Sequence, residues 1–327
     1  MLFPAIDILV KYDTRNPYRR QNYKAMRLTI VLFCTLLANI SFSQLVLEHH
    51  FESVGVGGRT INLPLKGPYR VTIDWGDGSR KESFEEASAP QTMFARSDRF
   101  ISHSYSRPGT KTITITGNLT SYGSSSPDLD NSTLVRVVSW DGLGIKSFED
   151  AFQNAVKLRS VPSSLPASVL NLSSMFSGAA NFNGSIGSWN TSNVLSMYAM
   201  FFRARSFNQP IGNWNTANVK DMGEMFSGAK SFNQPIGDWN TSNVQRMAGM
   251  FNMALSFNQP IGNWNTSRVK DMHGMFMDAV SFNQPIGNWN TSSVTDIYDM
   301  FNGARSFNQP IGDWDVSKVK SFNRMFL

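Results

Sequence analysis

The second half of the chain repeats one pattern of apolar and polar positions every 25 residues. Tryptophans keep this spacing at Trp189, Trp214, Trp239, Trp264, Trp289 and Trp314. Met–Phe pairs recur at the same interval, and their aromatic members include Phe201, Phe226, Phe251, Phe276 and Phe301. A fixed period of this order is typical of stacked repeat proteins, in which each unit covers the apolar side of the next. We therefore expect these tryptophans and phenylalanines to form the core of a repeat array.

Within one unit, the apolar positions have the spacing of a helix face. In the unit that begins at Trp214, apolar side chains fall at Val219, Met222, Met225, Phe226 and Ala229. This spacing predicts a short amphipathic helix or 3₁₀ turn, with Thr216 or Asn218 at its N-cap. The following Phe232, Ile236 and Trp239 predict a short strand, interrupted by Pro235 and Gly237. Each unit should then combine a helical segment with a strand, which predicts an α/β solenoid of the leucine-rich-repeat type.

A different pattern precedes the repeats. Residues 71–73 and 112–115 alternate between apolar and polar side chains, which predicts strands. The first is followed by the string W-G-D-G-S at 75–79, and the second is preceded by H-x-Y-x-x-P-G at 103–109. These strings resemble those of PKD-type domains, a family of small immunoglobulin-like β-sandwiches. The resemblance implies an all-β sandwich over residues 44–117, with Tyr105 as a tyrosine corner.

The N-terminus has the composition of a secretory signal. Basic residues precede the apolar run Leu28–Leu37, and small or polar residues follow it up to Ser43. We expect cleavage after Ser43, with translation starting at Met1 or Met26. The sole cysteine, Cys34, would leave with this segment. The run is too short to span a bilayer, so no transmembrane segment is expected after cleavage.

These patterns divide the chain into four parts. Residues 1–43 are an extension and signal peptide, 44–117 a β-sandwich, 118–133 a Ser/Gly/Pro-rich linker, and 134–327 the repeat solenoid. The first unit, up to about residue 183, departs from the repeat and is expected to act as a cap. The sequence ends inside a repeat at Leu327, which predicts a truncated product or a final half-unit that caps itself.

The repeat strings F-N-Q-P-I-G-N-W and V-x-x-M-x-x-M-F resemble those of BspA-like bacterial surface proteins, which are also seen in mycoplasma surface lipoproteins. The resemblance covers residues 145–327. It implies a leucine-rich-repeat-like solenoid at a bacterial surface, often associated with adhesion, and it brings no catalytic residue.

Charge and chemistry argue against several function classes. The net charge is +6, but residues 1–43 hold six basic and two acidic side chains, which leaves +2 for the rest. So weak a positive charge does not favour nucleic-acid binding. The four histidines and single cysteine have no metal-site or catalytic spacing, so we expect no enzyme activity, cofactor or metal. A calcium site at Asp74, Asp77 and Asp98 is the weaker alternative to turn capping.

Several columns of the repeat are candidates for ligand binding. The variable positions hold aromatic and charged side chains, and the residues expected to contact a ligand are Tyr198, Arg203, Arg205, Lys220, His273, Tyr298 and Arg305. Neutral surface variation explains the same positions equally well. The tryptophan column is either core or a sugar-stacking platform. The Asn columns, such as Asn208 and Asn233, are either a structural asparagine ladder or a glycan-binding array.

The sequence therefore predicts a non-catalytic protein, secreted or displayed at the bacterial surface. Its partner would be a protein or glycan on a host, the matrix or a neighbouring cell. The alternative is a structural protein of the cell envelope that self-associates through its repeats.

Overall fold

The computed structural model describes residues 43–52, 59–87 and 100–327. The predicted signal peptide, both candidate start methionines, Cys34 and Asp98 lie outside the described residues. Residues Ser43–Leu327 fall into one unit, which contains an N-terminal sheet region and the repeats.

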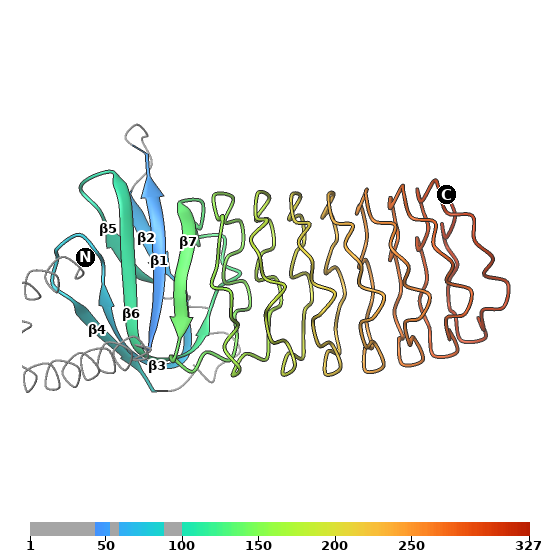
Figure 1. Ribbon diagram of the computed structural model, residues 1–327, viewed down its shortest axis with the longest axis horizontal. Helices are drawn as coiled ribbons and strands as arrows, with labels where there is room; N and C mark the ends of the chain where they lie inside the picture. The colour runs from blue at the N-terminus through green and yellow to red at the C-terminus, as the bar shows by residue number, and fades with distance from the viewer. Residues whose placement is uncertain (1–42, 53–58, 88–99) are drawn as a thin grey trace, which may run out of the picture. The chain divides into compact units, whose positions relative to one another are not determined.

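The sheet region is antiparallel throughout its described strands (Figure 1). Its larger sheet has the strand order β4-β3-β6-β1-β7, and β2 pairs with β5 in a second, two-stranded sheet. The strands are β1 (Gln44–Phe51), β2 (Thr60–Leu63), β3 (Leu65–Asp74), β4 (Glu82–Glu86), β5 (Ile101–Ser104), β6 (Gly109–Tyr122) and β7 (Leu134–Asp141). Two sheets are compatible with the β-sandwich expected for this region.

Alternation of side chains places the core between these sheets. In β1 and β6, Leu45 lies opposite Ile115 and Leu47 opposite Ile113. All four are fully buried, whereas the pair between them consists of Val46, which is 8% exposed, and the polar Thr114. The period of two that predicted strands is therefore the period that buries one face of the sheet.

The sheet extends beyond the residues assigned to it from the sequence. β6 continues to Tyr122, inside the segment interpreted as a linker. β7 lies in the range assigned to the repeats, yet it pairs antiparallel with β1 and forms an edge of the larger sheet.

The helical half of the repeat is a wrong prediction, and so is the α/β solenoid built on it. The described residues contain no α-helix, and the repeats contain no regular strand (Figure 1). Each 25-residue unit is instead a coil of tight turns. Neighbouring coils are joined by isolated parallel bridges such as Asp221↔Arg246, Arg246↔Asp271 and Asp271↔Asp296.

Backbone geometry explains why no helix forms. Within a coil, the N–H of Met225 bonds the carbonyl of Met222, and the N–H of Ala229 bonds that of Phe226. The N–H groups between them point outward: Glu224 donates to Ala248 and Phe226 to Met250 in the next coil. Glu224 also has a φ of 55°, in the left-handed region, as do its equivalents in other coils. A left-handed residue ends a right-handed helix, so three-residue turns succeed one another.

The coil core is a set of aromatic columns. Along the Phe226 column, successive ring centroids lie 5.7 to 5.8 Å apart from Phe176 to Phe301. The tryptophans from Trp189 to Trp314 stack in a second column at 6.1 to 6.5 Å. The same core contains the methionines Met197, Met222, Met247 and Met272, which are fully buried. Every coil is thus covered by the aromatic rings of its neighbours.

The stack begins directly on the sheet. Ser121 of β6 forms a parallel bridge with Ser147, and Arg136 of β7 forms one with Ser160. The buried indole of Trp140 in β7 packs on Phe148 at 5.0 Å and on Trp189 at 5.5 Å. In Figure 1 the first coils lie beside β7 and the later ones follow side by side. The edge of the sheet therefore covers the first coil.

Candidate functional site on the repeat ladder

One face of the coils carries side chains that change from unit to unit. We call it the ladder face and define it by two columns. The first holds the bridge residues Ser196, Asp221, Arg246, Asp271 and Asp296. The second lies two positions later and holds Tyr198, Gly223, Ala248, His273 and Tyr298. Tyr198, Arg246 and Tyr298 are exposed, Gly223 and Ala248 are buried, and the others are half-buried.

The backbone beneath the ladder face is held by bonds between coils. Met222 N–H donates to the carbonyl of Arg246 at 3.1 Å, Met247 N–H to Asp271 at 3.0 Å, and Met272 N–H to Asp296 at 2.9 Å. The methionine side chains point into the core, so the flanking side chains point outward. The face is therefore presented on a rigid scaffold.

At the N-terminal side of this face, Arg246 links two neighbouring coils. Its guanidinium lies 3.3 Å from the Asp221 carboxylate and 5.8 Å from the centre of the Tyr198 ring. Tyr198 lies over Gly223, whose missing side chain leaves room for the ring. Tyr198 is 37% exposed, so one side of its ring remains open to a ligand.

In the coil after Arg246, His273 and Asp271 form a second polar group. His273 Nδ1 lies 2.7 Å from Asp271 Oδ1, and this hydrogen bond raises the pKa of His273 against the opposing effect of burial. Burial works against ionisation of Asp271, but hydrogen bonds from His273 outweigh it, and the pKa of Asp271 lies below its usual value. The His273 ring stacks on Tyr298 at 4.7 Å and 8°.

A half-buried carboxylate lies next to this group. Burial raises the pKa of Glu224, while a hydrogen bond from Ser227 and the charge of His273 lower it. The Glu224 carboxylate packs against Gly249, where a side chain would collide with it. Several polar groups from successive coils therefore gather around His273.

The structure brings together some of the predicted ligand-contacting residues and separates others. His273 and Tyr298 touch, and Tyr198 belongs to the same column three coils before His273. Lys220 is exposed directly before Asp221. Arg203 lies in a different column, with its guanidinium 4.8 Å from the Phe202 ring. Arg205 and Arg305 are exposed, share a further column and lie four coils apart.

Sequence reasoning missed the bridge column itself. Asp221, Arg246, Asp271 and Asp296 alternate or repeat in charge at intervals of 25 residues. The spacing was present in the sequence, but only the bridges show that this position of each coil lies where neighbouring backbones pair.

The tryptophan column is buried core. The six indoles are 3 to 7% exposed. From Trp214 to Trp314, each Nε1 donates to an isoleucine carbonyl of the preceding coil, for example Trp239 to Ile211 at 3.1 Å. The rings cannot stack on a sugar in this position.

The asparagine column forms the ladder expected from the sequence. Asn233 Oδ1 accepts the backbone N–H of Asn258 at 3.0 Å and the side-chain amide of Gln259 at 3.0 Å. The same pair of bonds recurs at Asn183, Asn208, Asn258 and Asn283. These carbonyl oxygens are occupied within the stack.

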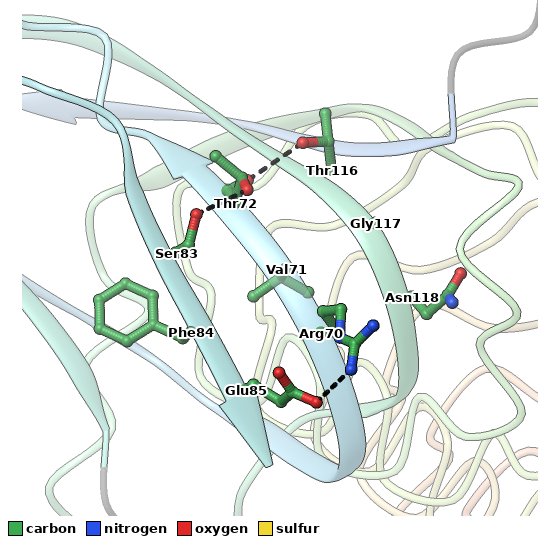
Figure 2. Close-up of a pocket in the computed structure, with 9 residues that line it drawn as sticks. All are labelled: Arg70, Val71, Thr72, Ser83, Phe84, Glu85, Thr116, Gly117 and Asn118. Atoms are coloured by element: carbon green, nitrogen blue, oxygen red, sulfur yellow. Dashed lines mark hydrogen bonds and ion pairs between the residues drawn. The ribbon is translucent and has the colours of Figure 1, made fainter. Parts of the chain in front are cut away.

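The sheet region offers a second concave surface. A groove of about 530 Å³ lies across β4, β3 and β6. Figure 2 shows the side chains that line it. Arg70 and Glu85 form an ion pair at 2.5 Å, and Thr72 bonds Ser83 at 3.0 Å. Because these polar groups pair with one another across the strands, the groove is less suited to ligand binding than the ladder face.

Asp74 and Asp77, two of the three residues considered above as calcium ligands, cap turns instead. Asp74 accepts the N–H of Gly76 at 3.0 Å and pairs with Lys81 at 3.2 Å. Asp77 accepts the N–H of Ser79 at 3.0 Å and lies 2.8 Å from His103 Nε2. These bonds hold the pKa of both carboxyl groups below the usual range.

The fold and the ladder face define a protein class, namely a repeat protein of stacked 25-residue coils joined by parallel bridges. Within that class, the chain belongs to the family described as "Mycoplasma protein of unknown function, DUF285", which matches residues 146–260 and 235–327. The expected relation to mycoplasma repeat proteins is thus confirmed at the level of the family. No curated protein and no solved structure matches the chain. Among the described residues there is no helix with the length and apolar character needed to cross a membrane.

Proposed function

We propose that this chain is a non-catalytic, exported surface protein that binds a protein or glycan through its ladder face. The observation that carries the proposal is the contrast between core and face. The buried columns hold nearly the same side chain in every coil, whereas the second ladder column reads Tyr198, Gly223, Ala248, His273 and Tyr298. A stack that serves only as a spacer requires no such exposed aromatic groups.

The chemistry of the face suits a polar partner. Tyr198 and Tyr298 each present 37% of their surface, with Arg246, Asp271 and His273 beside them. Tyrosine and arginine supply large contact areas together with hydrogen-bonding groups, which is why both are enriched at binding interfaces. Because the backbone is held between coils, binding has to order only the side chains and not the chain that carries them.

The sheet region is assigned the role of a spacer of the PKD type in this proposal. The Tyr105 hydroxyl donates to the carbonyl of Trp75 at 2.9 Å, and His103 stacks on Trp75 at 4.6 Å. In a tyrosine corner the hydroxyl bonds the backbone a few residues upstream, so this bond to a residue 30 positions earlier is not that motif, but it ties the two strings together. It supports the resemblance found in the strings around 75–79 and 103–109.

A binding screen tests the proposal directly. The full chain is applied to arrays of glycans and matrix proteins, beside a variant with Tyr198→Ala, Arg246→Ser and Tyr298→Ala. Each new residue already occurs in its column, at Ala248 and Ser196, so the coils should still form. We expect saturable binding that weakens at least tenfold in the variant. Asp238→Asn is the matched control, because neighbouring coils hold Asn213 and Asn263 there.

The screen can also contradict the proposal. Absence of saturable binding, or equal binding by the parent and the triple variant, would exclude the ladder face as the binding surface.

Self-association in the cell envelope is the second candidate function. It is favoured by a groove of about 350 Å³ along an edge that is nearly identical in successive coils, lined by Pro235, Gly237, Pro260, Gly262 and Pro285. Light scattering over a range of concentrations distinguishes the two. Oligomers that grow with concentration, together with a negative screen, would favour this candidate.

A further inference from the structure

Three metal-ligating side chains converge on the ladder face. One ligand atom each of Asp271, His273 and Asp296 lies within 4.8 Å of the others. All three side chains are half-buried, and they come from two adjacent coils joined by the Asp271↔Asp296 bridge. The ladder backbone therefore holds them close together independently of any ligand.

The order of charges along the bridge column singles out this position. Asp221 and Arg246 occupy neighbouring rungs with opposite charges and form an ion pair at 3.3 Å. Asp271 and Asp296 also occupy neighbouring rungs, about 4.8 Å apart along the ladder, but carry like charges. Like charges placed directly opposite destabilise a β-bridge. Within the described part of the chain, no lysine or arginine pairs with Asp296, so a cation at this point would remove the repulsion.

The donor set indicates the kind of cation. Two carboxylate oxygens and one imidazole nitrogen suit zinc and similar divalent transition metals, whereas calcium prefers oxygen ligands alone. Zinc bonds these donors at about 2.0 to 2.2 Å, so ligand atoms on one ion lie about 3 to 4 Å apart. Half-exposed carboxylates can rotate to close the remaining gap, and His273 exchanges its 2.7 Å bond to Asp271 for the metal. Water would complete the coordination.

We propose that Asp271, His273 and Asp296 form a binding site for one divalent transition-metal ion of the zinc type. Two further charges act on it. Arg246 lies beside Asp271 and opposes a cation, while Glu224 lies beside His273 and favours one. Arg246 is already engaged by Asp221, so the surrounding charge is net negative. The site is independent of whether the ladder face binds a protein or glycan.

Isothermal titration calorimetry with zinc chloride tests this site. The full chain carries Cys34→Ser throughout, because a free thiol would bind zinc on its own. His273→Ala and Asp296→Ser are compared with this parent, and both new side chains occur in the same columns at Ala248 and Ser196. Asp238→Asn is again the control, and calcium chloride is titrated in parallel.

We expect one zinc ion per parent chain at this site, and at least tenfold weaker binding in His273→Ala and in Asp296→Ser. Asp238→Asn should bind as the parent does, and calcium should bind at least tenfold more weakly than zinc. Circular dichroism of each variant checks that the coils are intact. A parent that does not bind zinc, or variants that bind it as tightly as the parent, would overturn the proposal.

Discussion

The sheet region and the repeat stack bury their apolar side chains in opposite ways. In the sheet, strands pair along their whole length, as β1 does with β6 over eight residue pairs, and each core side chain has a different environment. In the stack, isolated bridges and further backbone hydrogen bonds, such as that from Phe226 to Met250, join neighbouring coils, and core aromatic rings stack on their counterparts in the coils on either side. Stability is therefore concentrated at individual contacts in the sheet and distributed along columns in the stack. Three changes test this difference, in order of decreasing effect.

The largest effect should come from a gap in an aromatic column. Phe251 is fully buried and stacks at 5.7 Å on both Phe226 and Phe276, and at 3.9 Å on Phe257. Phe251→Ala should lower the free energy of unfolding by about 3–5 kcal/mol, because it leaves a cavity in the middle of the stack. Urea unfolding followed by tryptophan fluorescence measures the change.

The end of the same column provides the control. Phe326 is 63% exposed and stacks only on Phe301 among the described rings. Phe326→Ala should change the free energy by about 0.5 kcal/mol or less. Equal losses at the two positions would show that the column does not behave as a continuous core.

The next effect concerns a single buried group in the sheet. His49 is 3% exposed, its Nε2 has no hydrogen-bond partner among the described residues, and burial lowers its pKa from 6.5 to about 4. Between these pH values the unfolded chain binds a proton that the folded chain does not. The free energy of unfolding is therefore highest above pH 6.5. It falls by about 3 kcal/mol as the pH drops towards 4.

Urea unfolding at pH 7 and at pH 4.5 measures this loss. His49→Gln should remove that part of the pH dependence, whereas His50→Gln, half-buried on the opposite side of the same strand, should keep it. If the His49→Gln and parent curves fall in parallel with pH, His49 is not the responsible group.

The smallest effect should come from one rung of the asparagine ladder. Asn233→Ala removes the acceptor for the Asn258 N–H and for the Gln259 amide, both at 3.0 Å. Leaving these donors without a partner should cost about 1–3 kcal/mol. The same unfolding experiment measures it, with the exposed Asn263→Ala as the control. A loss as small as the control's would mean that water bonds the two freed donors as well as Asn233 does.

Several features of the molecule could be read from the sequence because they depend on local alternation or on strict periodicity. The strands around Val71 and Ile113 follow from a period of two. The burial of the tryptophan and phenylalanine columns follows from the 25-residue repeat, since only stacking covers so many apolar groups. The asparagine ladder follows from the same repeat, because identical polar side chains in register can bond one another.

The candidate site was only partly predictable. Tyr198, His273 and Tyr298 stood out as variable aromatic positions, and the structure places them in one column of the ladder face. Asp271 and Asp296 did not stand out, because their proximity depends on which residue of each coil forms the bridge.

The tertiary structure decided between a helix and a chain of turns. Apolar residues three and four positions apart, as at Met222, Met225 and Phe226, are buried on one side by a helix and equally by a succession of three-residue turns. In this protein the N–H groups of alternate residues bond the next coil, and residues such as Glu224 adopt a left-handed backbone. Those bonds exist only once a neighbouring coil is present. Local periodicity therefore determined which side chains are buried, while contacts between coils determined the backbone that buries them.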